Sequence, residues 1–166
     1  MNLRAGKRTI GAGEPCFIAA EIGINHNGDM ELARRMIVAA AEAGADAVKF
    51  QNYRTEDFVS DRALLHRYTQ GGREVVESQY EMFKRCELAP GALRRLAEVA
   101  RDCGIEFFST PTSIDGIAEL VNAGATLVKN GSDFLTQLDL VRAMAASGLP
   151  TVLSTGMAPS RRSTTL

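Results

Sequence analysis

The sequence predicts an α/β protein with a TIM-type (β/α) barrel that is truncated after about five strands. Short apolar runs alternate with helical patterns, and a glycine separates helix from run in EAGADAVKF, DCGIEFF, NAGATLVK and ASGLPTVLS. Each apolar run also ends in polar or charged residues. Alternation with short connections indicates a parallel sheet, and polar strand ends favour a barrel, because all its strands end at one face.

The first unit of the chain follows a turn-rich entry or small hairpin over residues 1–15, which are rich in glycine. The apolar run 16–21 is typical of a buried strand, and a loop rich in glycine and asparagine follows it. Asp29 is a good N-cap for a helix over 30–43, which Gly44 ends. The sequence therefore begins with a strand, a loop and a helix.

The second unit contains a long insertion. The strand 47–50 is followed by a charged excursion over 52–74, in which Leu64, Leu65 and Tyr68 could cover another surface. We expect a helix from Glu74 to Cys86 and another from about Ala89 to Gly104.

The remaining pattern repeats the unit without insertions. Strands are predicted over 106–109, 126–129 and 151–154, with helices over 113–122 and 136–146 between them. Residues 159–166 lack apolar periodicity, and we expect a disordered polar tail there. The predicted organisation is thus an entry over 1–15, a partial barrel over 16–158 and a tail over 159–166.

A doubly wound sheet is the competing architecture. It usually carries a glycine-rich phosphate loop after its first strand, but the corresponding segment, GINHNGD, lacks the GxGxxG spacing. A barrel is favoured, although eight units need about 250 residues and this chain has 166.

Composition excludes several classes of partner. The net charge is −1, from 19 basic and 20 acidic side chains, so no overall field favours nucleic acid or an anionic membrane. No run approaches about 18 apolar residues and no leader pattern is present, which predicts a cytoplasmic protein. Three widely spaced cysteines, Cys16, Cys86 and Cys103, fit a reducing compartment and a role as small buried hydrophobes.

Two lysines, Lys49 and Lys129, end apolar strands. An unpaired buried charge is costly, so each ammonium group needs an anion. Hydroxyl side chains at neighbouring strand ends would complete a pocket for phosphate or carboxylate: Ser109, Thr110, Ser132, Ser154 and Thr155. Alternatively, each lysine pairs with a structural acid such as Glu21.

Other candidate chemistry is sparse. Glu21 could orient a substrate, act as acid or base, support a metal or form a buried ion pair. His26 could be a ligand or a proton-transfer group, but a single histidine does not make a metal site, and no metal ligand is assigned. Neither a Ser-His-Asp set nor a GxSxG elbow is present.

Five segments together resemble the sialic acid synthase family, the N-acetylneuraminate synthases and their nonulosonic-acid relatives. In order over residues 15–158, they read AEIGINHNGDMELARRMIVAAAEAGADAVKFQ, SQYEMFKRCEL, FFSTP, VKNGS and LSTGMA. The resemblance implies a (β/α)8 barrel followed by an antifreeze-like domain. It also implies condensation of phosphoenolpyruvate with N-acetylmannosamine or a related N-acylated amino sugar, a Mn²⁺ or Mg²⁺ cofactor, and a homodimer at full length.

The resemblance also assigns residues. The expected phosphoenolpyruvate ligands are Lys49, Thr110, Lys129, Ser132 and Ser154. Glu21 and Gln51 match residues on the sugar and reaction-centre side, so Glu21, Lys49 and Gln51 are the expected catalytic residues. Asn25 and His26 belong to the NHNG loop of the family.

Three departures from the family pattern limit these expectations. Phe134 replaces the glutamate that usually contacts the sugar, with Asp133 one place earlier. The acidic helix that usually follows Met157-Ala158 is not continued, and the two metal-binding histidines of later strands have no counterpart here. The chain alone is therefore expected to be inactive. Two alternatives are a different phosphoenolpyruvate-condensing sugar-acid synthase and a non-catalytic half-barrel that binds an anion or a partner chain.

Overall fold

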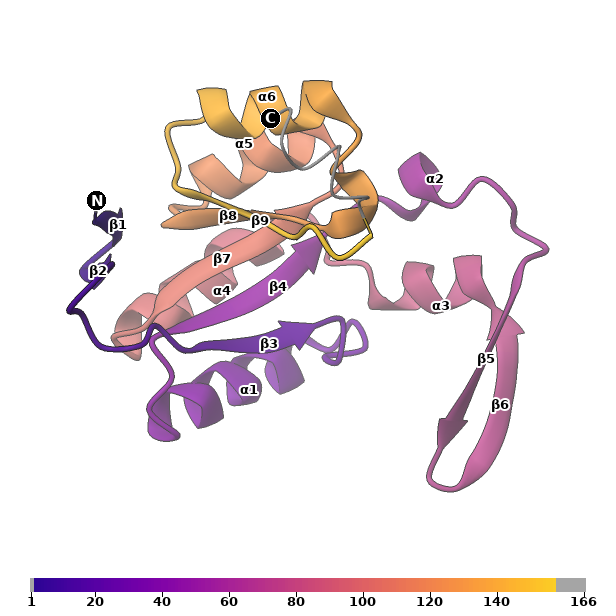
Figure 1. Ribbon diagram of the computed structural model, residues 1–166. Coiled ribbons are helices and arrows are strands. Elements are labelled where there is room, and N and C mark those ends of the chain that lie inside the picture. The colour runs from indigo at the N-terminus through magenta and orange to yellow at the C-terminus, as the bar shows by residue number, and fades with distance from the viewer. Residues whose placement is uncertain (1, 158–166) are drawn as a thin grey trace.

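Five parallel strands form the central sheet of the molecule (Figure 1). The computed structural model describes residues 2–157, apart from the side chain of Gln70. The strands are β3 (Ala19–Gly23), β4 (Ala47–Asn52), β7 (Glu106–Pro111), β8 (Leu127–Asn130) and β9 (Thr151–Leu153), and they lie in this order. The order of a doubly wound sheet reverses at a switch point, whereas this one runs in sequence, as in a barrel wall. The predicted α/β class and the partial barrel are confirmed.

Four helices pack against one face of this sheet. They are α1 (Met30–Glu42), α4 (Ala92–Asp102), α5 (Ile114–Asn122) and α6 (Leu138–Ala146). Side chains from all four join one apolar core with strand residues, among them Val48, Phe50, Phe107 and Val128. Since side chains alternate along a strand, the residues between these point to the other face.

The predicted N-cap of α1 is confirmed, and α5 has a side-chain cap of the same kind. The Asp29 carboxylate accepts hydrogen bonds from the backbone N–H groups of Glu31 (2.8 Å) and Leu32 (3.0 Å). Ser113 Oγ accepts one from Gly116 N at 3.1 Å. Each cap satisfies backbone donors that the first turn of a helix leaves without partners.

The entry segment forms a hairpin of β1 (Leu3–Ala5) and β2 (Arg8–Ile10). Ala5 packs with Ala47, Phe108 and Leu127 on the face of the sheet opposite the helices. The buried Glu106 carboxylate accepts a hydrogen bond from Lys7 N at 2.8 Å. The hairpin therefore covers the amino-terminal end of this face and leaves the carboxyl-terminal end open.

The insertion after β4 differs from the prediction. It contains α2 (Thr55–Phe58), β5 (Leu65–Gln70), β6 (Arg73–Ser78) and α3 (Gln79–Cys86), with β5 and β6 paired antiparallel. The predicted helix from Glu74 was wrong in its first turn, because residues 73–78 form a strand. Gly71 and Gly72 both have positive φ (57° and 77°), as a tight hairpin turn requires, and α3 begins only after its N-cap, Ser78.

Smaller corrections concern element ends. The first strand of the sheet begins at Ala19 rather than Cys16, and Cys16 is exposed, so its assignment as a buried hydrophobe was wrong; Cys86 is buried. A short 3-10 helix, η1 (Ser132–Phe134), precedes α6, which starts at Leu138 rather than 136. The predicted tail over 159–166 lies outside the described residues. Within 2–157, no helix combines the length and apolarity needed to cross a membrane.

Candidate functional site

Five of the predicted site residues lie on the open face at the carboxyl ends of the strands. Glu21 is paired in register with Lys49, and Gln51 with Thr110. Ser109 is paired with Val128, so Lys129 lies one position further, beside Thr110. Paired residues of neighbouring parallel strands share a face, and Val48 and Phe50 occupy the helix face. We call Glu21, Lys49, Gln51, Thr110 and Lys129 the rim.

Lys49 is the cation of the rim with the most partners. Its Nζ lies 3.0 Å from Glu21 Oε2 and donates hydrogen bonds to Thr110 Oγ1 (3.1 Å) and to the carbonyl oxygen of Phe50 (3.3 Å). The Lys49 side chain is 10% exposed and that of Glu21 is 58% exposed. The structural pairing with Glu21 considered from the sequence is thus present. The carboxylate nevertheless faces solvent, where a substrate could reach it.

Lys129 has a weaker set of partners. Its Nζ donates to the carbonyl oxygen of Asn130 at 3.0 Å, and it forms no ion pair within residues 2–157. Burial lowers the pKa of Lys129, and the positive charge of Lys49 lowers it further, while Glu21 and Asp133 act in the opposite direction. Lys49 is paired with Glu21, but Lys129 lies beside a second cation without an ion pair of its own in the described residues, an arrangement that favours a bound anion.

The two predicted serines flank the rim. Ser132 begins η1, directly after β8, and Ser154 follows β9, where its N–H donates to the carbonyl oxygen of Asn130 at 3.1 Å. Both are half-buried. Ser132 therefore follows the strand that carries Lys129, and Ser154 follows the strand beside it.

Two hydroxyl candidates from the sequence, Ser109 and Thr155, do not join the rim. Ser109 is buried on the helix face, paired with Phe50 and Val128, because it is one residue out of phase with Thr110. Thr155 is exposed beyond β9. Phe134 packs partly against the main core, which leaves the exposed Asp133 as the acidic side chain next to this segment.

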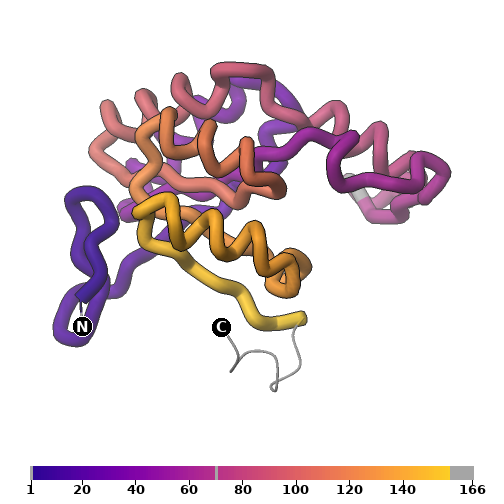
Figure 2. Tube along the Cα trace, turned by 90° about the horizontal axis from the view of Figure 1, so that it is seen from above, coloured from indigo at the N-terminus to yellow at the C-terminus, as the bar shows by residue number. Residues whose placement is uncertain are grey.

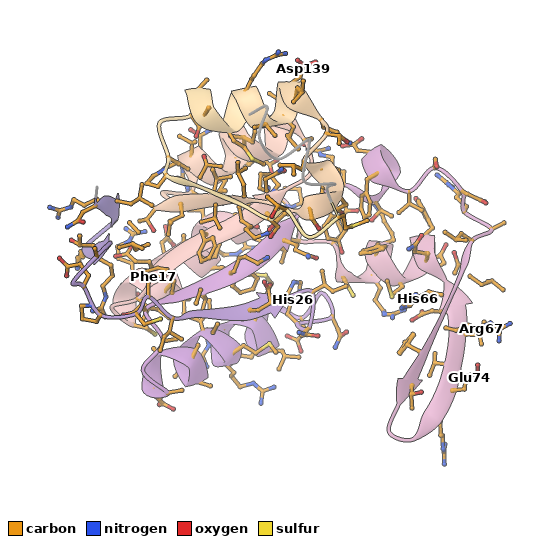
Figure 3. The ribbon with its side chains drawn as sticks, in the orientation of Figure 1. Phe17, His26, His66, Arg67, Glu74 and Asp139 are labelled. Atoms are coloured by element: carbon orange, nitrogen blue, oxygen red, sulfur yellow. The ribbon has the colours of Figure 1, made fainter. Side chains whose placement is uncertain are left out.

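His26 is a buried histidine of the helix face. Its ring lies 5.8 Å from that of Phe50, and its Nδ1 accepts a hydrogen bond from Gly28 N at 3.1 Å (Figure 3). Burial lowers its pKa, which favours the neutral ring. The structure therefore assigns it to the loop after β3 rather than to proton transfer at the rim. Asn25, in the same loop, is exposed.

The described residues contain no group of three His, Cys, Asp or Glu side chains that could hold a metal ion. The residues of this part of the chain thus do not fit the metal that the family resemblance implies.

Two hollows lie away from the rim. One of about 270 Å³ is lined by Asn52, Arg94 and Ser113, and one of about 220 Å³ by Gly6, Glu106 and Thr126. The rim itself is not enclosed, because the five strands form an arc and not a closed wall. We assign the site from its charged side chains and not from the hollows, since neither hollow holds a rim residue.

Sequence reasoning missed the carbonyl oxygens of Phe50 and Asn130, which accept hydrogen bonds from the two lysines. Backbone acceptors leave no signal in the residue types. The lysines themselves were found because each ends an apolar run.

The arc of β/α units defines a partial (β/α) barrel with two lysines at the carboxyl ends of its strands. A sequence model described as the NeuB family matches residues 36–164, so the chain belongs to the NeuB family. Members of this family include sialic acid synthases, enzymes that form carbon–carbon bonds.

Several curated relatives are named as synthases of sialic acid-type sugars. The chain is 38% identical to N,N'-diacetyllegionaminic acid synthase of Legionella pneumophila over 152 residues, which are 92% of this chain and 43% of the relative. It is 34% identical to N-acetylneuraminate-9-phosphate synthase of Homo sapiens over 151 residues, 90% of this chain and 42% of the relative. The chain therefore spans less than half the length of these relatives.

Solved structures of other synthases share the fold of this chain. N-acetylneuraminic acid synthetase from Leptospira borgpetersenii, in complex with citrate, superposes with a TM-score of 0.83 at 32% identity and covers 98% of this chain and 52% of its own. A truncated 3-deoxy-D-arabino-heptulosonate 7-phosphate synthase from Thermotoga maritima shares the fold, with a TM-score of 0.66 at 14% identity over 98% of this chain and 48% of its own.

Proposed function

We propose that this chain forms the phosphoenolpyruvate-binding side of a nonulosonic acid synthase. The reaction would condense phosphoenolpyruvate with N-acetylmannosamine or a related N-acylated amino sugar to give a sialic acid-type product and phosphate. The observation that carries the proposal is the pair of cations, Lys49 and Lys129, on one rim of a NeuB-family barrel wall.

The strand order supports a division of the rim. Thr110 and Lys129 lie on β7 and β8, to one side of Lys49, and Glu21 lies on β3, to the other side. Phosphoenolpyruvate carries two anionic ends, which Lys49, Thr110 and Lys129 would neutralise together with Ser132 and Ser154. Glu21 and Gln51 would then contact the sugar.

In the proposed reaction, C3 of phosphoenolpyruvate attacks the aldehyde carbon of the open-chain sugar. Water adds at C2, and phosphate leaves by cleavage of the C2–O bond. The rim residues hold the phosphate and carboxylate so that C3 faces the Glu21 side, which lowers the entropy cost of bringing two substrates together. The Mn²⁺ or Mg²⁺ expected for the family has no fitting ligand set in residues 2–157.

The ligand preference of the chain tests this function. Thermal unfolding is measured with phosphoenolpyruvate, with inorganic phosphate and with pyruvate at equal millimolar concentration. Phosphoenolpyruvate should stabilise the chain most, because it alone offers both anionic ends to the rim. Equal stabilisation by phosphate would instead support the non-catalytic half-barrel that binds any anion.

Turnover is measured in parallel. The 166-residue chain is incubated with phosphoenolpyruvate, N-acetylmannosamine and Mn²⁺, and the release of phosphate is followed. We expect the rate to be far below the roughly 1 s⁻¹ or more that is typical of enzymes. Release at such a rate would refute the proposal that the chain supplies only one side of the site. The homodimer expected for full-length members also stays a prediction.

A further inference from the structure

Gly23 is the last residue of β3, two positions after Glu21. β3 lies at one edge of the sheet, and its carboxyl end is at the end of the sheet that the entry hairpin leaves open. Figure 1 and Figure 2 both show the entry hairpin (β1 and β2) and the insertion after β4 at opposite ends of the molecule. The entry hairpin therefore does not cover the surroundings of Glu21.

The pairing of β3 with β4 is irregular at this point. Glu21 is opposite Lys49. The next residue of β4, Phe50, is opposite Gly23 and not Ile22, so the register shifts by one residue, as in a β-bulge. Ile22, the additional residue, is 4% exposed and packs in the main core. Bulges are frequent next to active sites, where they redirect a side chain or end the pairing of two strands.

Two properties of position 23 favour a residue without a side chain. The φ of Gly23 is 56°, in the left-handed region, where a residue with a Cβ atom is strained. A Cβ atom at this position would also lie 3.3 Å from Glu21 Oε1, which is closer than ordinary van der Waals contact. The other oxygen of the same carboxylate, Oε2, lies 3.0 Å from Lys49 Nζ. The carboxylate therefore contacts the ammonium group through one oxygen and lies near the bare Cα of Gly23 with the other.

A side chain at position 23 would displace the carboxylate rather than the backbone. The Glu21 side chain is 58% exposed and can move into solvent, whereas Gly23 is buried. Lys49 would keep its hydrogen bonds to Thr110 Oγ1 and to the carbonyl oxygen of Phe50, since neither acceptor belongs to β3. The cation would thus stay in place and lose its neutralising charge.

We propose that Gly23 is a positioning residue, which holds the Glu21 carboxylate against Lys49 and so sets how strongly the rim attracts an anion. The carboxylate and an incoming anion compete for the same ammonium group, because each gains by neutralising it. Gly23 acts through Glu21 and does not itself contact the substrate. The inference rests on the proposed function, since the anion considered is phosphoenolpyruvate.

Gly23→Ala in the 166-residue chain tests the proposal. It should tighten phosphoenolpyruvate binding about threefold in Kd, because one partly exposed charge changes an affinity by up to about fivefold. Calorimetric titration measures the Kd. Gly44→Ala is the matched control, since Gly44 also has a positive φ (83°) but open space around it. This control should bind phosphoenolpyruvate with the Kd of the original chain.

The Glu21→Ala background separates positioning from a general structural effect. Without the carboxylate, adding Gly23→Ala should leave the Kd at the value of Glu21→Ala alone. An unchanged Kd for Gly23→Ala in the original chain would overturn the proposal. The same change of Kd in both backgrounds would also overturn it, because Gly23 would then not act through Glu21.

Gly23→Asn is a second variant in case Gly23→Ala does not fold. Asparagine tolerates the left-handed region better than alanine, and Asn27 of the same loop has a φ of 50°. The Cβ atom of the new side chain would meet the Glu21 carboxylate in the same way. We therefore expect the same tightening of phosphoenolpyruvate binding, again only when Glu21 is present.

Thermal unfolding without ligand distinguishes a failure of this inference from a failure of the proposed function. Gly23→Ala should lower Tm by about 3 °C more than Gly44→Ala, because loss of the Glu21–Lys49 contact adds to the backbone strain. The difference should disappear in the Glu21→Ala background, and its persistence there would contradict the role of Gly23. If no chain bound phosphoenolpyruvate while this difference behaved as expected, the proposed function would be wrong and the positioning of Glu21 by Gly23 would be supported.

Discussion

The ammonium group of Lys49 is held by acceptors from three adjacent strands, β3, β4 and β7. Each acceptor compensates part of the cost of burying a charge. Of the three, Glu21 carries the only full charge and is also the most open to solvent, so an incoming anion could take over its role. The same residue therefore stabilises the buried ammonium group of Lys49 and borders the proposed substrate position.

Replacing Glu21 separates these two roles. Glu21→Gln should destabilise the chain by about 1–2 kcal/mol, less than the 3–5 kcal/mol of a fully buried pair, because more than half of the Glu21 side chain is exposed. Millimolar phosphoenolpyruvate should recover part of the loss. Urea unfolding with and without the ligand measures both effects.

A matched control is Glu31→Gln, which breaks the exposed ion pair with Arg34 on α1. It should change stability little and show no recovery with ligand. Equal losses for the two variants would mean that the Glu21–Lys49 pair behaves as an ordinary surface pair.

At the scale of elements, the loop after β3 and the carboxyl end of α3 fit closely together. Gly28 has a φ of 79°, and a Cβ atom there would come 2.3 Å from the carbonyl oxygen of Arg85. The loop after β3 thus packs on α3, the helix that follows the β5–β6 hairpin. The glycines and asparagines of the sequence predicted a loop here. They could not predict its contact with α3, because that contact joins Gly28 and Arg85, which are 57 positions apart.

Gly28→Ala tests this contact. It should destabilise the chain by about 3 kcal/mol, because backbone strain of about 1–2 kcal/mol adds to a clash with a backbone atom that cannot move freely. Gly44→Ala is the control, since Gly44 ends α1 with a φ of 83° and open space around it, and it should cost only the strain. Thermal unfolding of both variants provides the comparison, and equal losses would show that the loop does not depend on α3.

At the scale of the whole molecule, the sequence was sufficient for the arc of β/α units. Glycines mark the helix ends, and apolar runs mark strands buried on both faces, so the five strands and their common rim could be predicted. The β5–β6 hairpin could not be predicted, because its strands are largely exposed and its charged residues are also compatible with a helix. The sequence also did not show that Thr110 faces the rim while Ser109 and His26 face the helices. That assignment depends on strand register, which a continuous apolar run does not specify.

The lowered pKa of Lys129 predicts how its charge affects the stability of the folded chain. A pKa lowered in the folded chain means that folding disfavours the charged ammonium group, so the contribution of Lys129 to stability should rise with pH between its lowered pKa and the ordinary lysine pKa. Without ligand, Lys129→Met should therefore be at least as stable as the original chain. Lys49→Met removes a cation that has three acceptors, and it should lower stability.

The most direct test of the central claim is the shift in unfolding free energy that phosphoenolpyruvate produces in four chains: the original, Lys49→Met, Lys129→Met and the control Lys7→Met, whose side chain lies on the entry hairpin. At a ligand concentration ten times Kd, the original chain and the control should gain about 1.4 kcal/mol. The two rim variants should gain almost nothing. Equal stabilisation of all four chains, or of none, would contradict a phosphoenolpyruvate site at the rim.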